Sequence, residues 1–231
     1  MPSKPRIFDP NKFYHIYNRG VDKRIIYPDD SYFSKFIEIL SYYKHEGRTI
    51  SYAQLIDKSS NPNVLETLLD PQGLEPRVKV ISYCLMPNHF HLVLKPILFN
   101  GIGKFLSDVT NSYTRYFNLK NDRSGRLFES TYKYKEVDND ISVLNLTVYV
   151  HLNPVTSNKI KQILKPQDYI YSSYKYWVEK QNKQLSRLLD HAEIRYWTNT
   201  FGGARHYRRL TETKMGNKPE SGIEDLIIEN P

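Results

Sequence analysis

The stretch Val78-Lys-Val-Ile-Ser-Tyr-Cys-Leu85, Met86-Pro-Asn88, His89-Phe-His-Leu-Val-Leu94 is the most strand-like part of the chain. Its β-branched and aromatic residues favour extended backbone, and the short Pro-Asn segment favours a tight turn. We therefore predict two strands paired as a hairpin. Side chains alternate across a strand, so Phe90, Leu92 and Leu94 share one face, and His89 and His91 share the other.

Further predicted elements surround this hairpin. They are a strand over Phe13–Asn18, a helix from an N-cap at Asp30 to Gly47, a helix over Ile102–Phe117, a strand over Thr131–Val137 and a helix from the Asp138–Asp140 cap to Asn153-Pro154. The order β-α-β-β-α-β is that of the ferredoxin-like split βαβ fold, so we predict an α+β protein with a four-stranded antiparallel sheet. Both crossover helices then cover one face, which leaves the other face open for function and for the additional C-terminal helix.

Two segments depart from this plan. Residues 48–77 contain Ser59-Ser-Asn-Pro62 and Asp70-Pro-Gln-Gly73, and we interpret them as an insertion with one short helix over residues 63–69. We expect one domain over residues 1–158 and a mostly helical extension over 159–231, with a loosely held tail from Thr211.

Composition narrows the classes of protein. The 231 residues are 39% apolar and 25% charged, which is typical of a soluble globular chain, and no apolar run approaches the ~20 residues of a membrane span. Cys84 is the only cysteine and the first residues lack an apolar leader, so we expect a protein of the reducing cytoplasm. The 33 Lys and Arg against 25 Asp and Glu give a net charge of +8, which favours polyanionic partners. The 19 Tyr and 10 Phe, often beside Arg or Lys, suit single-stranded nucleic acid, although ordinary packing would also account for such rings.

The paired histidines are the most specific chemical feature. Two imidazoles on one strand face can chelate one cation, and the alternative is two strand histidines with unrelated hydrogen bonds. The third helix carries a polar stripe of Ser142, Asn145, Tyr149 and Asn153. If this helix lies on the uncovered face, Tyr149 approaches His89 and His91, and Asn153 offers an amide oxygen to the same metal. The alternative for Tyr149 is a packing residue with a hydrogen-bonded hydroxyl.

Together these groups indicate a reaction class. A metal with open coordination positions can polarise a phosphodiester oxygen, and an aligned tyrosine hydroxyl can attack phosphorus to form a phosphotyrosine. Such a site would nick and rejoin nucleic acid. We expect Mg²⁺ or Mn²⁺ as the cofactor.

Five blocks of sequence, in order, resemble the single-tyrosine HUH transposases, in particular their REP-associated tyrosine transposase branch. The blocks are Tyr14-His-Ile-Tyr-Asn-Arg-Gly20, Leu85-Met-Pro-Asn-His-Phe-His-Leu92, Tyr113-Thr-Arg-Tyr-Phe-Asn118, Arg123-Ser-Gly-Arg-Leu-Phe128 and Tyr149-Val-His-Leu-Asn-Pro-Val155. The resemblance implies a metal-dependent endonuclease and strand transferase that acts on single-stranded DNA with hairpins. It also implies that His89 and His91 are metal ligands, that Tyr149 joins the 5′ phosphate and releases a 3′ hydroxyl, and that Asn153 completes the metal site.

Basic residues near the open face are predicted DNA contacts, although each alone could be an ordinary surface charge. They are Arg19, Lys23, Arg24, Arg115, Arg123, Arg126, Lys133 and Lys135. We expect His15 to support the site or to be a hydrogen-bonded core residue, and His151 to play no part. The competing functions are a domesticated hairpin-binding protein with little cleavage and a water-using phosphodiesterase. The chain could act as a monomer or as a homodimer.

Overall fold

The four predicted strands form one antiparallel sheet in the order β2-β3-β1-β4, the arrangement expected of a ferredoxin-like fold. The computed structural model describes residues 6–48, 50–58, 73–156, 163–179 and 187–215. The strands are β1 (Phe13–Arg19), β2 (Val78–Met86), β3 (His89–Pro96) and β4 (Lys133–Val137). The helices that pack on them are α1 (Asp30–Tyr43), α4 (Gly101–Lys120) and α5 (Asp140–Thr156).

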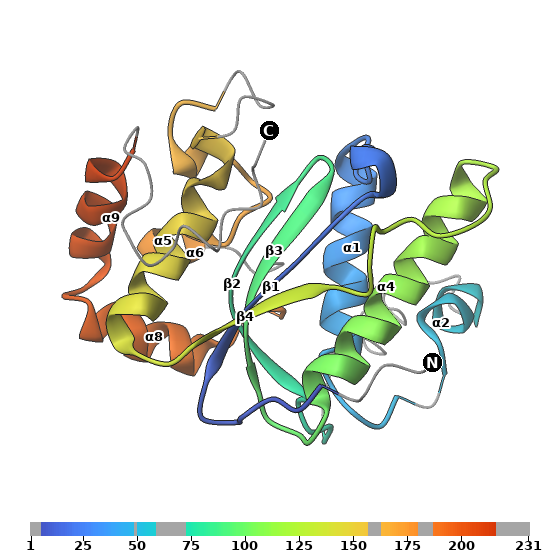
Figure 1. The fold of residues 1–231 in the computed structure, drawn as a ribbon, viewed down its shortest axis with the longest axis horizontal. Helices are drawn as coiled ribbons and strands as arrows, with labels where there is room; N and C mark the ends of the chain where they lie inside the picture. The colour runs from blue at the N-terminus through green and yellow to red at the C-terminus, as the bar shows by residue number, and fades with distance from the viewer. Residues whose placement is uncertain (1–5, 49, 59–72, 157–162, 180–186, 216–231) are drawn as a thin grey trace.

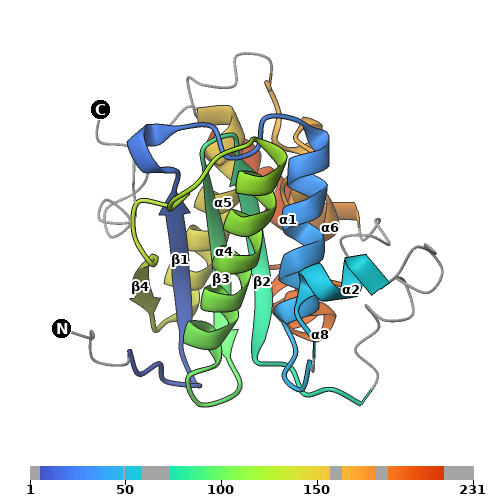
Figure 2. The same ribbon diagram turned by 90° about the vertical axis from the view of Figure 1, so that its right-hand side faces the viewer.

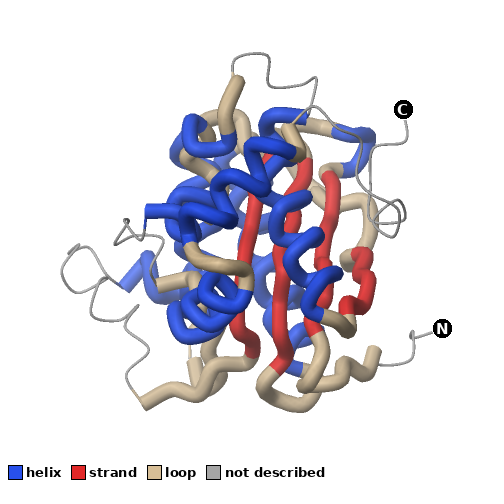
Figure 3. The backbone as a smooth tube through the Cα atoms, turned by 90° about the vertical axis from the view of Figure 1, so that its left-hand side faces the viewer, coloured by secondary structure: helices blue, strands red, loops and turns tan. Residues whose placement is uncertain are grey.

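The sheet lies between two layers of helices. Helices α1 and α4 cover one face, and α5 covers the other together with the helices that follow it (Figure 1). Figure 2 shows α1 and α4 in front of the strands, and Figure 3 shows the opposite layer. The apolar residues Phe90, Leu92 and Leu94 of β3 are fully buried under α1 and α4, as their alternation predicts. The face that the crossover helices leave free carries α5, as expected for the additional helix, and the C-terminal extension packs beside it.

Helix ends differ from the predictions for local reasons. The N-cap of α1 is Asp29 and not Asp30, because the Asp29 carboxylate accepts a hydrogen bond of 2.8 Å from the Ser31 N–H. Helix α5 does not stop at Asn153-Pro154 but runs to Thr156 with Pro154 inside it. A proline in the last turn removes only one intrahelical hydrogen bond, so the helix tolerates it there. Strand β4 begins at Lys133, two residues later than predicted.

The insertion leaves and re-enters the core at one point. His45 and Pro76 form an antiparallel bridge, and the Arg77 N–H donates to the Lys44 carbonyl over 2.8 Å. The buried Arg77 guanidinium pairs with Glu46 at 2.6 Å and with Asp108 of α4 at 2.5 Å. A helix that the sequence did not predict, α2 (Tyr52–Lys58), lies inside the insertion. The helix predicted over residues 63–69 lies outside the described residues.

The C-terminal extension is helical, as predicted, and packs on the sheet layer. Its elements are η2 (Pro166–Asp168), α6 (Tyr174–Glu179), α8 (His191–Thr200) and α9 (Ala204–Thr213). The Trp177 indole N–H donates to the Ile81 carbonyl of β2 over 3.1 Å. Helix α9 continues to Thr213, so the chain just after Thr211 is ordered, and residues 216–231 lie outside the described part.

Cys84 is a buried, free cysteine, as its apolar setting in β2 indicated. Among the helices that the structure describes, none combines the length and the apolar character needed to cross a bilayer.

The buried His45 at the base of the insertion makes stability depend on pH. Desolvation, with help from Lys44 and Arg48, lowers the pKa of His45 to about 4, below its ordinary value near 6.5. Between these two pKa values the unfolded chain binds a proton that the folded chain does not. The contribution of neutral His45 to the free energy of unfolding is therefore fully present above pH 6.5 and is lost as the pH falls toward 4. We predict that the free energy of unfolding of the wild type falls by about 2 to 3 kcal/mol more than that of His45→Gln between pH 7 and pH 4. Urea denaturation at a series of pH values measures this difference, and parallel curves for the two proteins would contradict it.

Candidate active site

Strand register gathers three histidines on the face covered by α5. Tyr17 pairs with His91 and Arg19 pairs with His89, so these four side chains share one face of the sheet. His15, two residues before Tyr17, lies on the same face, and its ring stacks on that of His91 with centroids 5.1 Å apart. His15, His89 and His91 are all fully buried. The predicted side-by-side placement of His89 and His91 is therefore present, with a third imidazole next to it.

Hydrogen bonds orient the two predicted ligands in the same way. His91 Nδ1 lies 2.9 Å from His15 Nε2, and His89 Nδ1 lies 2.7 Å from the Asn88 side-chain oxygen. An amide oxygen only accepts, so His89 carries its proton on Nδ1 and its lone pair on Nε2. Asn88 is itself held by a 3.0 Å hydrogen bond to the Lys23 carbonyl. For His91, a proton on Nδ1 donated to His15 would likewise leave the lone pair on Nε2, and that atom has no hydrogen-bond partner among the described residues.

Burial keeps the imidazoles of His91 and His15 neutral. Desolvation lowers the pKa of His91 to about 3, with a smaller contribution from the positive charge of Arg19. Desolvation also lowers the pKa of His15 well below its ordinary value, and His91 and Lys135 add to the effect. A neutral imidazole is the form that ligates metal ions. At neutral pH these two imidazoles are therefore in the form that can bind a metal ion or accept a hydrogen bond.

Tyr149 projects from α5 toward these rings. Its ring is perpendicular to that of His91, with centroids 5.7 Å apart, and lies 5.9 Å from that of His15. The ring is half-buried, whereas Val143, Leu146 and Val150 of the same helix are buried. Tyr149 thus occupies the predicted position beside the histidines and outside the packed interior.

Asn153 lies one turn beyond Tyr149 and is buried. Its side-chain N–H donates to the Tyr149 carbonyl over 2.9 Å, which directs the amide oxygen away from that carbonyl. Within the described ranges, no cluster of three or more His, Cys, Asp or Glu side chains has the arrangement of a metal site. Any metal here would rely on two imidazoles with the Asn153 amide oxygen, because no carboxylate joins them.

The predicted DNA contacts do not form one surface. Arg115 is exposed on α4, in the layer on the far side of the sheet from the histidines, so its expected place near the site is wrong. Arg123 braces its own loop, donating to the Asn118 side chain at 2.7 Å and to the Arg126 carbonyl at 3.1 Å. Arg19 is buried beside His89 in the register of β1 and β3.

The other predicted contacts lie on or near the histidine face. Lys133 and Lys135 pair with Tyr17 and His15 across β1 and β4, so both lysines point to that face. Lys23 and Arg24 follow β1, next to the turn that carries Asn88. Arg126 is exposed in the loop whose Leu127 carbonyl accepts from the Val21 N–H over 2.9 Å, and this loop therefore lies at the same end of β1.

The segment after β1 has an unusual backbone. Asp22 and Lys23 have φ values of 58° and 56°, in the left-handed region that side chains other than glycine seldom adopt. Gly20 admits no side chain, because a Cβ there would lie 2.5 Å from the Arg24 carbonyl oxygen. The tight turn packs Lys23 against Asn88 and so indirectly fixes the His89 ring.

His151 has a structural role that the sequence analysis missed. Its ring is fully buried, and its two nitrogens lie 2.7 Å from the Tyr207 hydroxyl of α9 and 2.8 Å from the Ser173 hydroxyl. It therefore fastens the helix that carries Tyr149 to the C-terminal extension. This role could have been inferred from its position outside the polar stripe of the helix, because a histidine on the apolar side of a helix needs buried hydrogen-bond partners.

We predict that His151→Leu lowers the free energy of unfolding by about 2 kcal/mol or more, because the buried Tyr207 and Ser173 hydroxyls each lose a hydrogen-bond partner. Guanidinium denaturation measures the loss. The exposed His206 of α9 provides the matched control, and His206→Leu should change stability by less than about 0.5 kcal/mol. Equal effects of the two substitutions would show that the buried hydrogen bonds contribute nothing.

Comparison with known proteins supports the fold and indicates a family for part of the chain. A solved structure of a REP-associated tyrosine transposase bound to a REP hairpin shares the fold, with a TM-score of 0.50 and 11% identity over 80% of this chain and 90% of that one. No curated protein matches the chain. The family model of IS200-like transposases matches residues 48–153, a range that contains His89, His91, Tyr149 and Asn153. This part of the chain, which includes the β2–β3 hairpin and most of α5, is therefore similar to IS200-like transposases.

Proposed function

We propose that this protein is a metal-dependent endonuclease and strand transferase that nicks and rejoins single-stranded DNA next to hairpins. The observation that carries the proposal is the approach of the Tyr149 ring to His91 and His15, at 5.7 and 5.9 Å between centroids. A tyrosine that served only for packing would have no need of neutral imidazoles beside its ring. The match of residues 48–153 to the family model of IS200-like transposases supports a DNA-processing enzyme.

Tyr149 acts as the nucleophile in this proposal. Its hydroxyl oxygen attacks the phosphorus of a phosphodiester, the bond from phosphorus to the 3′ oxygen breaks, and the 5′ phosphate remains on the tyrosine. The number of phosphodiester bonds is unchanged, so a 3′ hydroxyl can attack the adduct and rejoin the strand. Helix α5 supports this role because its apolar side is buried against the sheet, which holds the ring in one place.

His89, His91 and Asn153 would hold a divalent metal ion, Mg²⁺ or Mn²⁺. The fit rests on His91 Nε2, a buried lone-pair nitrogen without a hydrogen-bond partner in the described residues, and on the Asn88 contact that leaves the lone pair of His89 on Nε2. When bound, such an ion withdraws charge from a phosphate oxygen. His15 has a proposed positioning role, in which its Nε2 accepts from the His91 Nδ1–H and so leaves the lone pair of His91 on Nε2.

Hairpin DNA is the proposed partner. The structural neighbour is bound to a REP hairpin, and the basic groups at one end of the histidine face offer phosphate contacts. We assign these contacts to Lys23, Arg24, Arg126, Lys133 and Lys135, of which Lys23, Arg126 and Lys133 are exposed. Arg19 has a different proposed role, since its buried guanidinium adds positive charge next to His91.

The first test uses Tyr149→Phe, which removes the attacking hydroxyl and keeps the ring. With 5′- and 3′-labelled hairpin DNA and Mn²⁺, the wild type should form a denaturant-resistant adduct with the 5′-phosphate fragment. The variant should form none, while its affinity for the hairpin stays within about twofold. Retention of the DNA without any adduct by the wild type would indicate a hairpin-binding protein. Cleavage that survives in Tyr149→Phe would instead indicate attack by water.

The second test addresses His15. His15→Leu removes the acceptor for the His91 Nδ1–H and should weaken Mn²⁺ binding by about 10- to 100-fold. His15→Gln offers an amide oxygen in its place and should retain most of the affinity. Isothermal titration with Mn²⁺ measures both constants without reference to cleavage. Equal affinity in folded His15→Leu and wild type would exclude the positioning role.

A further inference from the structure

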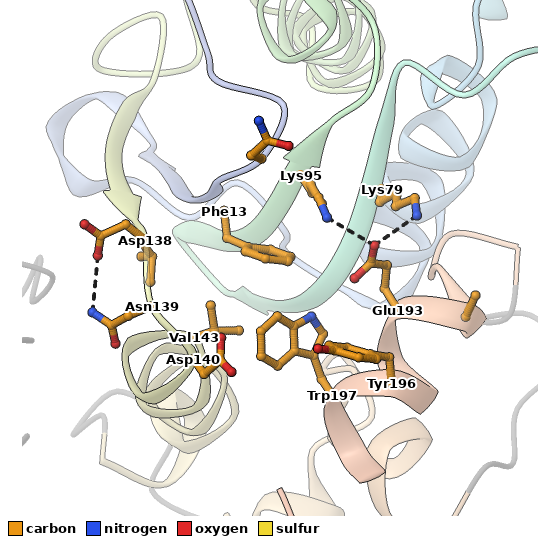
Figure 4. A pocket seen from close by; sticks show the side chains of 13 residues that line it. Phe13, Lys79, Lys95, Asp138, Asn139, Asp140, Val143, Glu193, Tyr196 and Trp197 are labelled. Carbon is orange, nitrogen blue, oxygen red and sulfur yellow. Dashed lines mark hydrogen bonds and ion pairs between the residues drawn. The ribbon is translucent and has the colours of Figure 1, made fainter. Parts of the chain in front are cut away.

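A hollow of about 500 Å³ lies on the histidine face, at the opposite end of the sheet from the basic loops. Phe13 lines it at the start of β1, two residues before His15, and Lys95 lines it four residues after His91 in β3. The remaining walls come from the first turns of α5 and from α8 (Figure 4). Because alternate residues share a face, the hollow and the histidines lie along the same strands.

Aromatic rings line much of this hollow. The rings of Phe13 and Trp197 are both almost fully buried and meet edge to face at 5.3 Å. Tyr196 is 58% exposed, and its ring lies 5.2 Å from that of Trp197. The Trp197 indole N–H has no hydrogen-bond partner among the described residues, and Figure 4 shows its nitrogen edge turned toward the hollow. Exposed and unpartnered groups of this kind suit a flat ligand that brings a hydrogen-bond acceptor.

The charges of the hollow disfavour a phosphate. Lys79 and Lys95 both contact the same carboxylate oxygen of Glu193, at 2.9 and 3.4 Å, so this carboxylate offsets one of their two positive charges. Asp138 and Asp140 line the wall formed by the start of α5 and its preceding residues. The Asp138 carboxylate accepts from the Asn139 side chain and is turned away, so Asp140 supplies the acceptor on this side. The ammonium groups of Lys79 and Lys95, with Glu193 between them, and the buried indole N–H of Trp197 lie on the other side. A neutral ring with N–H donors and with acceptors of its own matches both walls.

We propose that this hollow binds a nucleobase that carries an exocyclic amine, namely adenine, cytosine or guanine, of a DNA strand held at Tyr149. The exocyclic amine faces Asp140, and the ring packs against Tyr196 and Trp197. Six residues of α5 separate Val143, which lines the hollow, from Tyr149, a span of about 9 Å. Stacked nucleotides rise about 3.4 Å each, so a base two or three positions from the attacked phosphate reaches the hollow. The proposal rests on the proposed function only because that function supplies the DNA strand. Binding of a free base in the hollow does not depend on it.

Two measurements on the full chain separate the pocket from the transposase activity. The first is saturation-transfer NMR with free adenosine, cytidine, guanosine and thymidine, where signal is expected from the first three and little from thymidine. The second is fluorescence anisotropy with hairpin DNA whose single-stranded flank is all adenine or all thymine. Tyr196→Ala removes the exposed wall and should weaken binding of the adenine-flanked hairpin about tenfold, with less effect on the thymine-flanked one. Phe99→Ala, which removes another exposed ring outside the hollow, should change neither by more than about twofold.

The combined results distinguish failure of the base pocket from failure of the proposed function. Saturation transfer from adenosine that is lost in Tyr196→Ala, together with the adenine-specific loss of DNA affinity, supports the base pocket. Equal DNA affinities of Tyr196→Ala and Phe99→Ala, with no nucleoside signal, refute the pocket and leave hairpin binding intact. A nucleoside signal in a protein that binds no hairpin DNA overturns the strand and the proposed function together, and it identifies the hollow as a site for a free nucleoside or nucleotide.

Discussion

The hydrogen bond between His15 and His91 lies where β1 and β3 meet under α5, and the second layer of the molecule depends on it. An imidazolium buried on this face would carry a large desolvation cost, and an unpartnered neutral imidazole a smaller one. Pairing the two rings allows both to remain neutral and buried, which is the state that their lowered pKa values describe. Helix α5 can then pack its apolar residues on a face that also carries polar groups. Tyr149 reaches the site only because this packing is possible.

Much of the fold follows from local sequence. The alternation of apolar residues and histidines in β3 assigns each side chain to a face, and the Pro87-Asn88 turn makes the hairpin. These features, with two amphipathic helices, were sufficient to predict a ferredoxin-like fold with a four-stranded antiparallel sheet. The exact helix ends were not predictable, because the choice between Asp29 and Asp30 depends on a single side-chain hydrogen bond. Helix α2 was missed since it lies in an insertion whose turn residues indicated irregular chain.

The residues of the candidate site divide in the same way. The positions of His89, His91 and Tyr149 were predictable because strand and helix periodicity place their side chains. The environment of the arginines was not, because it depends on contacts that periodicity does not describe. Arg123 closes its own loop, and Arg19 is buried by packing against neighbouring strands. His151 has partners that are 22 and 56 residues away in sequence, so no local pattern could name them.

The C-terminal extension also closes the sheet. The Leu85 N–H donates to the Tyr171 carbonyl and the Ser173 N–H donates to the Tyr83 carbonyl, each over 3.0 Å, so residues 171–173 occupy the outer edge of β2. An uncovered strand edge invites pairing with other chains. A truncated protein that ended after α5 would expose the main-chain groups of β2 and become prone to self-association. The segment that follows α5 therefore protects this edge against aggregation, and natural or engineered shortening of this protein has to spare it.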